Sequence, residues 1–362
     1  MRIKNIILEL VEKLDLDLKG LVVTTEVASG DYVYLPLIAA LAGADKVYAL
    51  GRDTSYGKYI EHKARLSDIS RAFGVSRIIE PCETSSFNSW VESDIITNSG
   101  MVRPIDRAKL QQLKLTAVIP LMWETWEFRS NEIDINACQE FGIPVIGTEE
   151  KFGAIDMYEY PGMLALRMLF DVQCDFSSDK IALIGGGLTG TLIAKTLSRF
   201  NDSFLWFTDQ PLDKEFKRNS IPLRSLDSLI KEDYLDVIFV AEHSVNNPLI
   251  GNGAPITFEK IGEKFPDVKV VHLCGNIDKE NLVNSKLSFY PQNIAPFGHM
   301  SVFPSVMSVK PTLKLFSGGL KVGEIASKIR KRGGSIEEAI QATIDYGIGQ
   351  DFPGGFMSYG RD

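Results

Sequence analysis

The feature that most constrains the fold is the stretch from Lys180 to Asp209, KIALIGGGLTGTLIAKTLSRFNDSFLWFTD. It contains an apolar run, three spaced glycines, an amphipathic segment with helical spacing, and a second apolar run that ends at Asp209. This order predicts a strand, a tight turn, a helix and a second strand. Such a unit is typical of a parallel α/β sheet that binds a nucleotide.

The glycine spacing matches a dinucleotide-binding fingerprint. Gly185 permits the turn, Gly187 lets the backbone approach a pyrophosphate, and Gly190 allows the helix to pack closely on the strand. The N–H groups at the start of the helix, near Leu188 and Thr189, would face the phosphates. The alternative is a structural connection between strand and helix that binds nothing.

The carboxylate at the end of the second strand indicates which cofactor fits. Asp209 lies 19 residues after Gly190, where an acid can accept hydrogen bonds from both ribose hydroxyls. Its charge would repel a 2′-phosphate, and no arginine follows directly. We therefore expect NAD rather than NADP.

Composition narrows the class of protein. With 362 residues, of which 44% are hydrophobic and 24% charged, the chain has room for two globular domains. The net charge of −8 argues against nucleic acid or an anionic membrane as the main partner, so a small-molecule substrate is expected. The four cysteines lack CxxC spacing, which predicts neither disulfides nor a metal site. Reduced thiols fit this pattern best, so we expect a cytoplasmic protein. No run is long enough to span a bilayer.

Strands and helices alternate along the whole chain, which predicts two doubly wound parallel-sheet, Rossmann-like domains. Residues 1–150 are expected to form the first domain, and residues 151–312 the dinucleotide-binding domain. Expected elements include strands at 20–25, 46–50, 94–97, 117–120 and 220–223, and a helix at 322–331 that follows Gly318 and Gly319.

Polar residues follow several of these strands, at the edge where open α/β sheets bind ligands. They are Glu26 and Ser29, Arg52 and Asp53, Asn98, Ser99, Gly100 and Arg103, and the loop from Met122 to Arg129, which includes Glu124. Arg103 could clamp a carboxylate or phosphate. The alternative for Arg103 is a salt bridge to Asp106.

The order of the segments resembles the D-2-hydroxyacid dehydrogenase family and its structural relatives, which include S-adenosylhomocysteine hydrolase. The resemblance rests on DIITNSGMVRPIDRAKLQQLKLTAVIPL, IDINACQEFGIPVIGT, IALIGGGLTG and VVHLCGNIDKENL. It implies a flavodoxin-like substrate domain (1–150 with 313–362), a Rossmann NAD domain, an active site in the cleft between them, and a homodimer. It also implies cofactor contacts at Glu242, His243, Cys274 and Asn276.

The departures from that family are informative. Its dehydrogenases carry a substrate-binding arginine after the strand that here reads VVHLCG, but this turn holds Cys274, Gly275 and Asn276. A histidine acid/base is expected farther on, and His299 matches its position. Of the other histidines, His62 is expected to be solvated and His272 to be a core residue. The lysine and aspartate pair of the hydrolase is absent.

We therefore predict an NAD-dependent oxidoreductase that acts on a small polar hydroxy or keto compound, with His299 as acid/base. Arg103, Asn98, Ser99, Gly100 and Glu124 are the expected substrate contacts. Two alternatives remain open at this point. One is an enzyme that holds NAD tightly and uses transient oxidation for elimination or hydrolysis. The other is a non-catalytic nucleotide-binding sensor.

Overall fold

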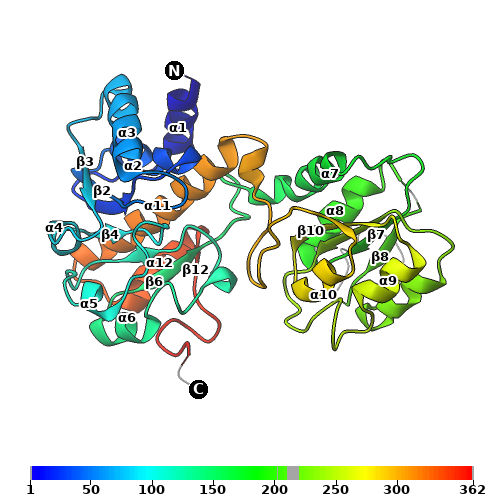
Figure 1. Cartoon of the computed structure of the whole chain (residues 1–362). Coiled ribbons are helices and arrows are strands. Elements are labelled where there is room, and N and C mark those ends of the chain that lie inside the picture. Colours follow the sequence, from blue (N-terminus) through cyan, green and yellow to red (C-terminus); the bar gives the residue numbers. More distant parts are fainter. Residues whose placement is uncertain (1, 202, 210–219, 361–362) are drawn as a thin grey trace. The chain divides into compact units, whose positions relative to one another are not determined.

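The computed structural model describes residues 2–201, 203–209 and 220–360. The chain divides into two compact units (Figure 1): unit 1 comprises residues 1–157 and 308–362, and unit 2 comprises residues 158–307. The sequence predicts the divisions at residues 150 and 312 instead. Residues 151–157 belong with unit 1 because Ile155 is fully buried in the core of that unit.

Unit 1 is built on parallel strands in which β-branched residues are buried. β1 (Val22–Glu26), β2 (Lys46–Gly51), β3 (Ile79–Glu83) and β4 (Ile95–Ile96) lie in the order β3-β2-β1-β4. A parallel bridge between Ile95 and Val118 connects β4 to the segment of β5 (Ile119–Pro120). Beyond β5 lie β6 (Val145–Thr148) and the antiparallel β12 (Gly349–Gln350).

Helices cover this sheet, and several begin or end at residues suited to caps. They are α1 (Arg2–Lys13), α2 (Leu35–Leu41), α3 (Tyr59–Phe73), α4 (Asn88–Val91), α5 (Arg107–Leu110), α6 (Ile135–Phe141), α11 (Lys310–Lys331) and α12 (Ile336–Asp345), with short 3-10 turns at Gly30–Tyr34 and Thr125–Glu127. Asp106 and Asp134 cap α5 and α6, and a capping box of Ser335 and Glu338 starts α12.

Helix α11 is longer than the sequence predicts. It begins at Lys310, not at Val322, and includes both glycines that were expected to precede the helix. A Cβ on Gly319 would lie 2.3 Å from Cε of Met122, and a Cβ on Gly318 would lie 2.7 Å from Cδ1 of Ile155. Glycine lowers helix propensity by about 1 kcal/mol, but here it permits close packing, which outweighs that cost.

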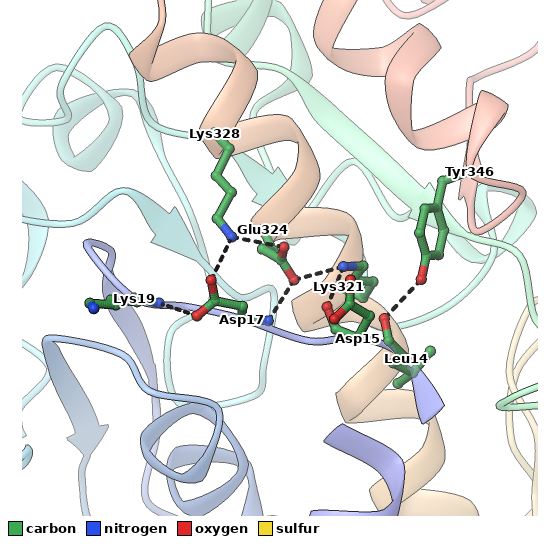
Figure 2. Close-up of polar contacts among 8 residues, drawn as sticks. All are labelled: Leu14, Asp15, Asp17, Lys19, Lys321, Glu324, Lys328 and Tyr346. Atoms are coloured by element: carbon green, nitrogen blue, oxygen red, sulfur yellow. Dashed lines mark hydrogen bonds and ion pairs between the residues drawn. The ribbon is translucent and has the colours of Figure 1, made fainter. Parts of the chain in front are cut away.

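Figure 2 shows how α11 fixes the loop after α1. Lys321 and Glu324 are 3% and 5% exposed and form an ion pair of 3.0 Å. The Glu324 carboxylate also accepts the N–H of Asp17 at 2.9 Å, and Lys321 donates to the carbonyl of Asp15 at 2.6 Å. Lys328 bridges Glu324 and Asp17 at 3.0 and 3.2 Å. These contacts join segments that are about 300 residues apart in the sequence.

Unit 2 is a five-stranded parallel sheet in the order β11-β10-β9-β7-β8. Its strands are β7 (Ile181–Ile184), β8 (Leu205–Phe207), β9 (Val237–Ala241), β10 (Lys269–Cys274) and β11 (Ser288–Tyr290). Its helices are α7 (Pro161–Asp171), α8 (Gly187–Leu197), α9 (Phe258–Lys264) and α10 (Lys279–Asn284), with 3-10 turns at Leu223–Lys231 and Pro304–Val306. A further 3-10 turn, Met157–Glu159, spans the division between the two units.

The expected strand at 220–223 is reduced to a single parallel bridge between Phe207 and Ile221, because a 3-10 helix starts at Leu223. The α/β class with parallel, Rossmann-like sheets is confirmed. In the ranges that the structure describes, no helix has both the length and the apolar character needed to cross a membrane.

Candidate functional site

The three glycines after β7 are required by the backbone around them. A Cβ on Gly185 would lie 2.6 Å from the carbonyl oxygen of Ala241, and one on Gly190 would lie 2.5 Å from the carbonyl carbon of Gly185. Both distances are far below a normal contact, so helix α8 can pack against the end of β7 only with glycine at these positions. Gly187 has φ of +60°, a conformation that side chains with a Cβ disfavour. The predicted roles of these residues in the turn are thus consistent with their geometry.

The glycine loop lies where the strand order of the sheet reverses. β8 lies on one side of β7 and β9 on the other, so the loops after β7 and β9 leave the same edge in different directions. Open α/β sheets bind ligands at this point. The helical N–H groups of α8, which include those of Leu188 and Thr189, begin at the same place.

Asp209 follows β8 at this edge and is exposed. Its Oδ1 accepts the backbone N–H of Leu223 at 3.0 Å, which starts the 3-10 helix. The carboxylate is therefore held in a fixed orientation beside the glycine loop, in a position where a ribose hydroxyl could reach it from solvent.

Glu242 follows β9 and is completely buried. Its Oε1 accepts both the N–H of Ser244 at 2.9 Å and the hydroxyl of Ser244 at 2.6 Å. Its Oε2 has no hydrogen-bond partner among the described residues. His243, the next residue, is half-buried.

The turn after β10 contains no charged side chain. Cys274 is 7% exposed, and Gly275 has φ of +132°, where an added Cβ would lie only 2.9 Å from the carbonyl oxygen of Glu242. The Asn276 amide donates to the carbonyl of Asn246, and its own carbonyl accepts the N–H of Leu249 at 2.8 Å. Asn276 thus ties this turn to the loop after β9.

His272 lies in β10 and is fully buried, as the sequence predicts for a core histidine. Its Nε2 lies 3.0 Å from the carbonyl of Gly275, which can only accept, so Nε2 carries the proton. Nδ1 must then accept from the hydroxyl of Ser301 at 2.7 Å. The Ser301 oxygen in turn accepts the N–H of Ala295 at 2.8 Å. One neutral histidine therefore links the turn after β10 to the segment that carries His299.

We expect His272 to take up a proton only at lower pH than an ordinary histidine does, because burial lowers its pKa. Since the unfolded chain binds the proton more readily, unit 2 should lose stability as pH falls below about 6.5. Long-range ¹H–¹⁵N correlation spectra should show one Nε2–H tautomer that persists to lower pH than the neutral form of an exposed histidine does. The pH-dependent part of the stability loss should shrink in His272→Asn. A titration midpoint near 6.5 for His272 would contradict this expectation.

His299 lies in the turn of residues 295–301 and is half-buried. Its backbone N–H donates to the carbonyl of Pro296 at 3.1 Å, and its Nδ1 lies 3.3 Å from the carbonyl of Phe297. That carbonyl can only accept, so Nδ1 carries the proton and Nε2 of the neutral ring is left as the acceptor. By contrast, His62 was expected to be solvated but is only 8% exposed, because α3 turns it inward.

The polar residues after β4 in unit 1 are largely occupied in holding the edge of the sheet together. Asn98 is 1% exposed and its Oδ1 accepts the N–H of Met122 at 2.9 Å. The hydroxyl of Ser99 lies 2.9 Å from that of Thr97. Gly100 is close enough to Glu26 that an added Cβ would lie 3.5 Å from Oε2 of that residue.

Arg103 pairs with Glu132 and its guanidinium lies 5.4 Å from the ring centroid of Trp123. The sequence suggested Asp106 as its alternative partner, but Asp106 caps α5 by accepting the N–H of Lys109 at 3.0 Å. Residue Glu132 is 29 positions beyond Arg103, and no local pattern indicates this pairing.

Glu124 is 5% exposed and accepts the indole N–H of Trp126 at 2.7 Å. Its other oxygen lies 3.3 Å from Nε2 of Gln350, which also donates to Glu149 at 2.9 Å. Gln350 is not among the predicted residues, because it belongs to the two-residue strand β12, which forms only by pairing with the distant β6.

Glu26 is the titratable residue whose environment the sequence did not reveal. It ends β1, is 2% exposed, and its Oε2 accepts the N–H of Met101 at 2.9 Å. Burial raises the pKa of Glu26 to about 7, although the Met101 N–H, Arg103 and Arg52 all act to lower it. The only signal in the sequence is an acid at the end of an apolar strand.

No set of His, Cys, Asp or Glu side chains suited to a metal ion occurs within the described ranges, and all four cysteines are free.

Comparison with known proteins finds similar structures but no related sequence family. No family model and no curated protein matches the chain. A dipicolinate synthase chain from Bacillus halodurans superposes with a TM-score of 0.54 and 10% identity, over 83% of this chain and 96% of its own. The corresponding dipicolinate synthase chain from Bacillus subtilis gives 0.53 and 12%, over 90% and 99%. At these identities the likeness shows a shared α/β fold.

Proposed function

We propose that unit 2 binds NAD and that the protein is an NAD-dependent oxidoreductase of a small polar hydroxy or keto compound. The observation that carries the proposal is the glycine loop at the switch point of the unit 2 sheet. Gly185 and Gly190 are fixed by close packing, Gly187 has positive φ, and Asp209 stands on the neighbouring strand end. Glu242 and His243 follow β9, Cys274 ends β10 and Asn276 follows it, all at the same edge, and we propose them as further cofactor contacts.

The chemistry that these residues support is proton transfer coupled to hydride transfer. Bound NAD would supply the hydride acceptor. Because Nδ1 of His299 donates to Phe297, Nε2 can accept the proton of a substrate hydroxyl and return it in the reverse direction. Asn98, Ser99, Gly100, Arg103 and Glu124 gather after strands of unit 1, and we propose that they contact the substrate.

We also propose that unit 2 forms a homodimer. Its support is a group of exposed apolar side chains. Phe170 of α7 and Phe200 after α8, which are 64% and 54% exposed, both pack against Phe176, with ring centroids 5.1 and 5.8 Å apart. Met163, two turns before Phe170 on α7, is 48% exposed. Apolar side chains gathered in this way are typical of interaction surfaces. Light scattering should then give twice the monomer mass, and Phe170→Glu should return it to the monomer value.

Replacing His299 with alanine is expected to leave NADH binding intact and to reduce turnover at least about 100-fold, because the proton acceptor is removed. NADH binding would be measured by fluorescence titration, and turnover by nicotinamide absorbance with a panel of 2-hydroxy and 2-keto acids. His62→Ala, in α3 of unit 1, serves as the matched control. Equal turnover by His299→Ala and the unaltered protein would remove His299 from the mechanism.

A second enzymatic function is suggested by the turn after β10. Cys274, Gly275 and Asn276 offer no cation there for a substrate carboxylate. A protein that keeps NAD bound and uses it transiently would consume substrate with no net change in nicotinamide absorbance. A sensor would bind NAD to saturation and convert none of these compounds. The same assay therefore separates the three possibilities.

A further inference from the structure

Unit 1 has a switch point of its own. In the order β3-β2-β1-β4, the chain runs to β2 on one side of β1 and to β4 on the other. β1 ends at Glu26, and the segment after β4 carries Gly100 to Arg103. A parallel sheet offers its ligand crevice at the carboxyl ends of these two strands.

A buried carboxyl group, that of Glu26, lies at this edge of the sheet. Glu26 holds the loop through Met101, and the charged groups that face it are Arg52 and Arg103. Tyr32 lies beside it, and Asp31 and Tyr56 lie beside Tyr32. Burial has raised the pKa of Glu26 to about 7 in spite of the two guanidinium groups. Near neutral pH the Glu26 carboxyl group can therefore change between its charged and its protonated form.

Arg52 supplies positive charge at the rim. Its side chain is exposed, and its guanidinium donates to the carbonyls of Met101 at 3.0 Å, Gly100 at 3.3 Å and Arg103 at 3.4 Å. These acceptors are neutral and leave the charge uncompensated. Across the described ranges no carboxylate forms an ion pair with Arg52. Arg103, in contrast, is paired with Glu132. With Glu26 protonated, the edge thus presents a net positive charge.

We propose that this edge of unit 1, formed by Glu26, Arg52 and the loop from Gly100 to Arg103, binds a small carboxylate ligand and takes up one solvent proton on Glu26 as it binds. The ligand carboxylate pairs with the guanidinium of Arg52. Its negative charge opposes ionisation of Glu26, so the Glu26 carboxylate accepts a proton from water. The protonated group then donates its O–H to the ligand, and no covalent bond forms or breaks.

This inference rests on the proposed function in one respect: the natural ligand would be a hydroxy or keto compound that carries a carboxylate. Binding itself can be tested without turnover. We would titrate the full chain with oxalate by calorimetry at pH 7.5, in buffers with different ionisation enthalpies, and record NADH binding on the same samples. Oxalate carries two carboxylates and cannot be oxidised at an alcohol carbon.

The expected result is uptake of up to one proton per oxalate, with affinity falling by up to about tenfold per pH unit above pH 7. Glu26→Gln, whose amide oxygen can still accept the Met101 N–H, should bind oxalate with no proton uptake. Arg52→Gln should lose at least about tenfold in affinity. Glu80→Gln, on β3, should behave as the unaltered protein does.

Absence of oxalate binding up to 10 mM, or equal proton uptake in Glu26→Gln and the unaltered protein, would overturn the proposal. If the protein binds NADH but not oxalate, the result counts against this site alone. If it binds oxalate with proton uptake but does not bind NADH, the result counts against the proposed function alone. Circular dichroism of each variant establishes that the chain is folded.

Discussion

Replacing Gly187 with valine is expected to lower the affinity for NADH at least about 100-fold. The residue has φ of +60°, and a β-branched side chain there is strained by about 1–3 kcal/mol. The larger effect is steric, because the Val side chain would occupy the space in which the start of α8 has to approach a pyrophosphate. A fluorescence titration with NADH measures the loss directly.

Two further variants separate strain from loss of the ligand site. Gly74→Val places the same residue at another glycine with positive φ, at the end of α3 in unit 1, where no neighbour lies within 4 Å of a Cβ. It should cost stability and leave NADH affinity unchanged. Asp209→Ala should weaken NADH by about tenfold and reduce the preference for NADH over NADPH. NADH affinity that is unchanged in both Gly187→Val and Asp209→Ala would rule out the nucleotide site.

In unit 2, the sequence best predicts the features that depend on residues close together in the chain. The turn after β7 needs glycine because three backbone segments meet there, and the spacing of Gly185, Gly187 and Gly190 records that need in six residues. His272 is predicted as a core residue because apolar residues surround it in the strand. Its link to Ser301 has no local signature, since the two residues are 29 positions apart.

Unit 1 shows where local rules fail. Two adjacent glycines argue against a helix, yet α11 passes through Gly318 and Gly319 because the helix packs against Met122 and Ile155. Likewise, no strand is expected near residue 350, but Gln350 belongs to β12, which pairs with β6, and its side chain contacts Glu124. In each case tertiary contacts between distant segments overrode the propensity of the segment.

The polar residues of unit 1 do follow strands, as the sequence predicts, but the role of each side chain depends on its ion-pair or hydrogen-bond partner. Arg103 was the natural choice for an anion clamp, and it is occupied by Glu132 and stacked near Trp123. Arg52 has the same side chain and donates only to carbonyls. The sequence treats the two arginines alike, and only the fold shows which of them keeps an unbalanced charge.

Replacing Glu324 with alanine is expected to have the largest effect on stability, with a loss of about 3–5 kcal/mol in the free energy of unfolding of unit 1. The change leaves Lys321, which is 3% exposed, without its carboxylate, and it removes the acceptor for the N–H of Asp17. For a unit of this size the loss corresponds to a fall of roughly 6–20 °C in Tm. Calorimetry would resolve it as a shift of one transition.

Asp17→Ala is the matched control for this network, because the Asp17 side chain is 60% exposed and its bond to Lys328 is a surface ion pair. It should cost no more than about 1 kcal/mol. Glu324→Gln should fall between the two, since its amide oxygen can still accept the Asp17 N–H while Lys321 remains without a counter-charge. The stability losses of the three variants thus separate the contribution of the buried charge from that of the hydrogen bond to Asp17. If Glu324→Ala destabilised unit 1 no more than Asp17→Ala, the buried network in Figure 2 would contribute no more than a surface ion pair.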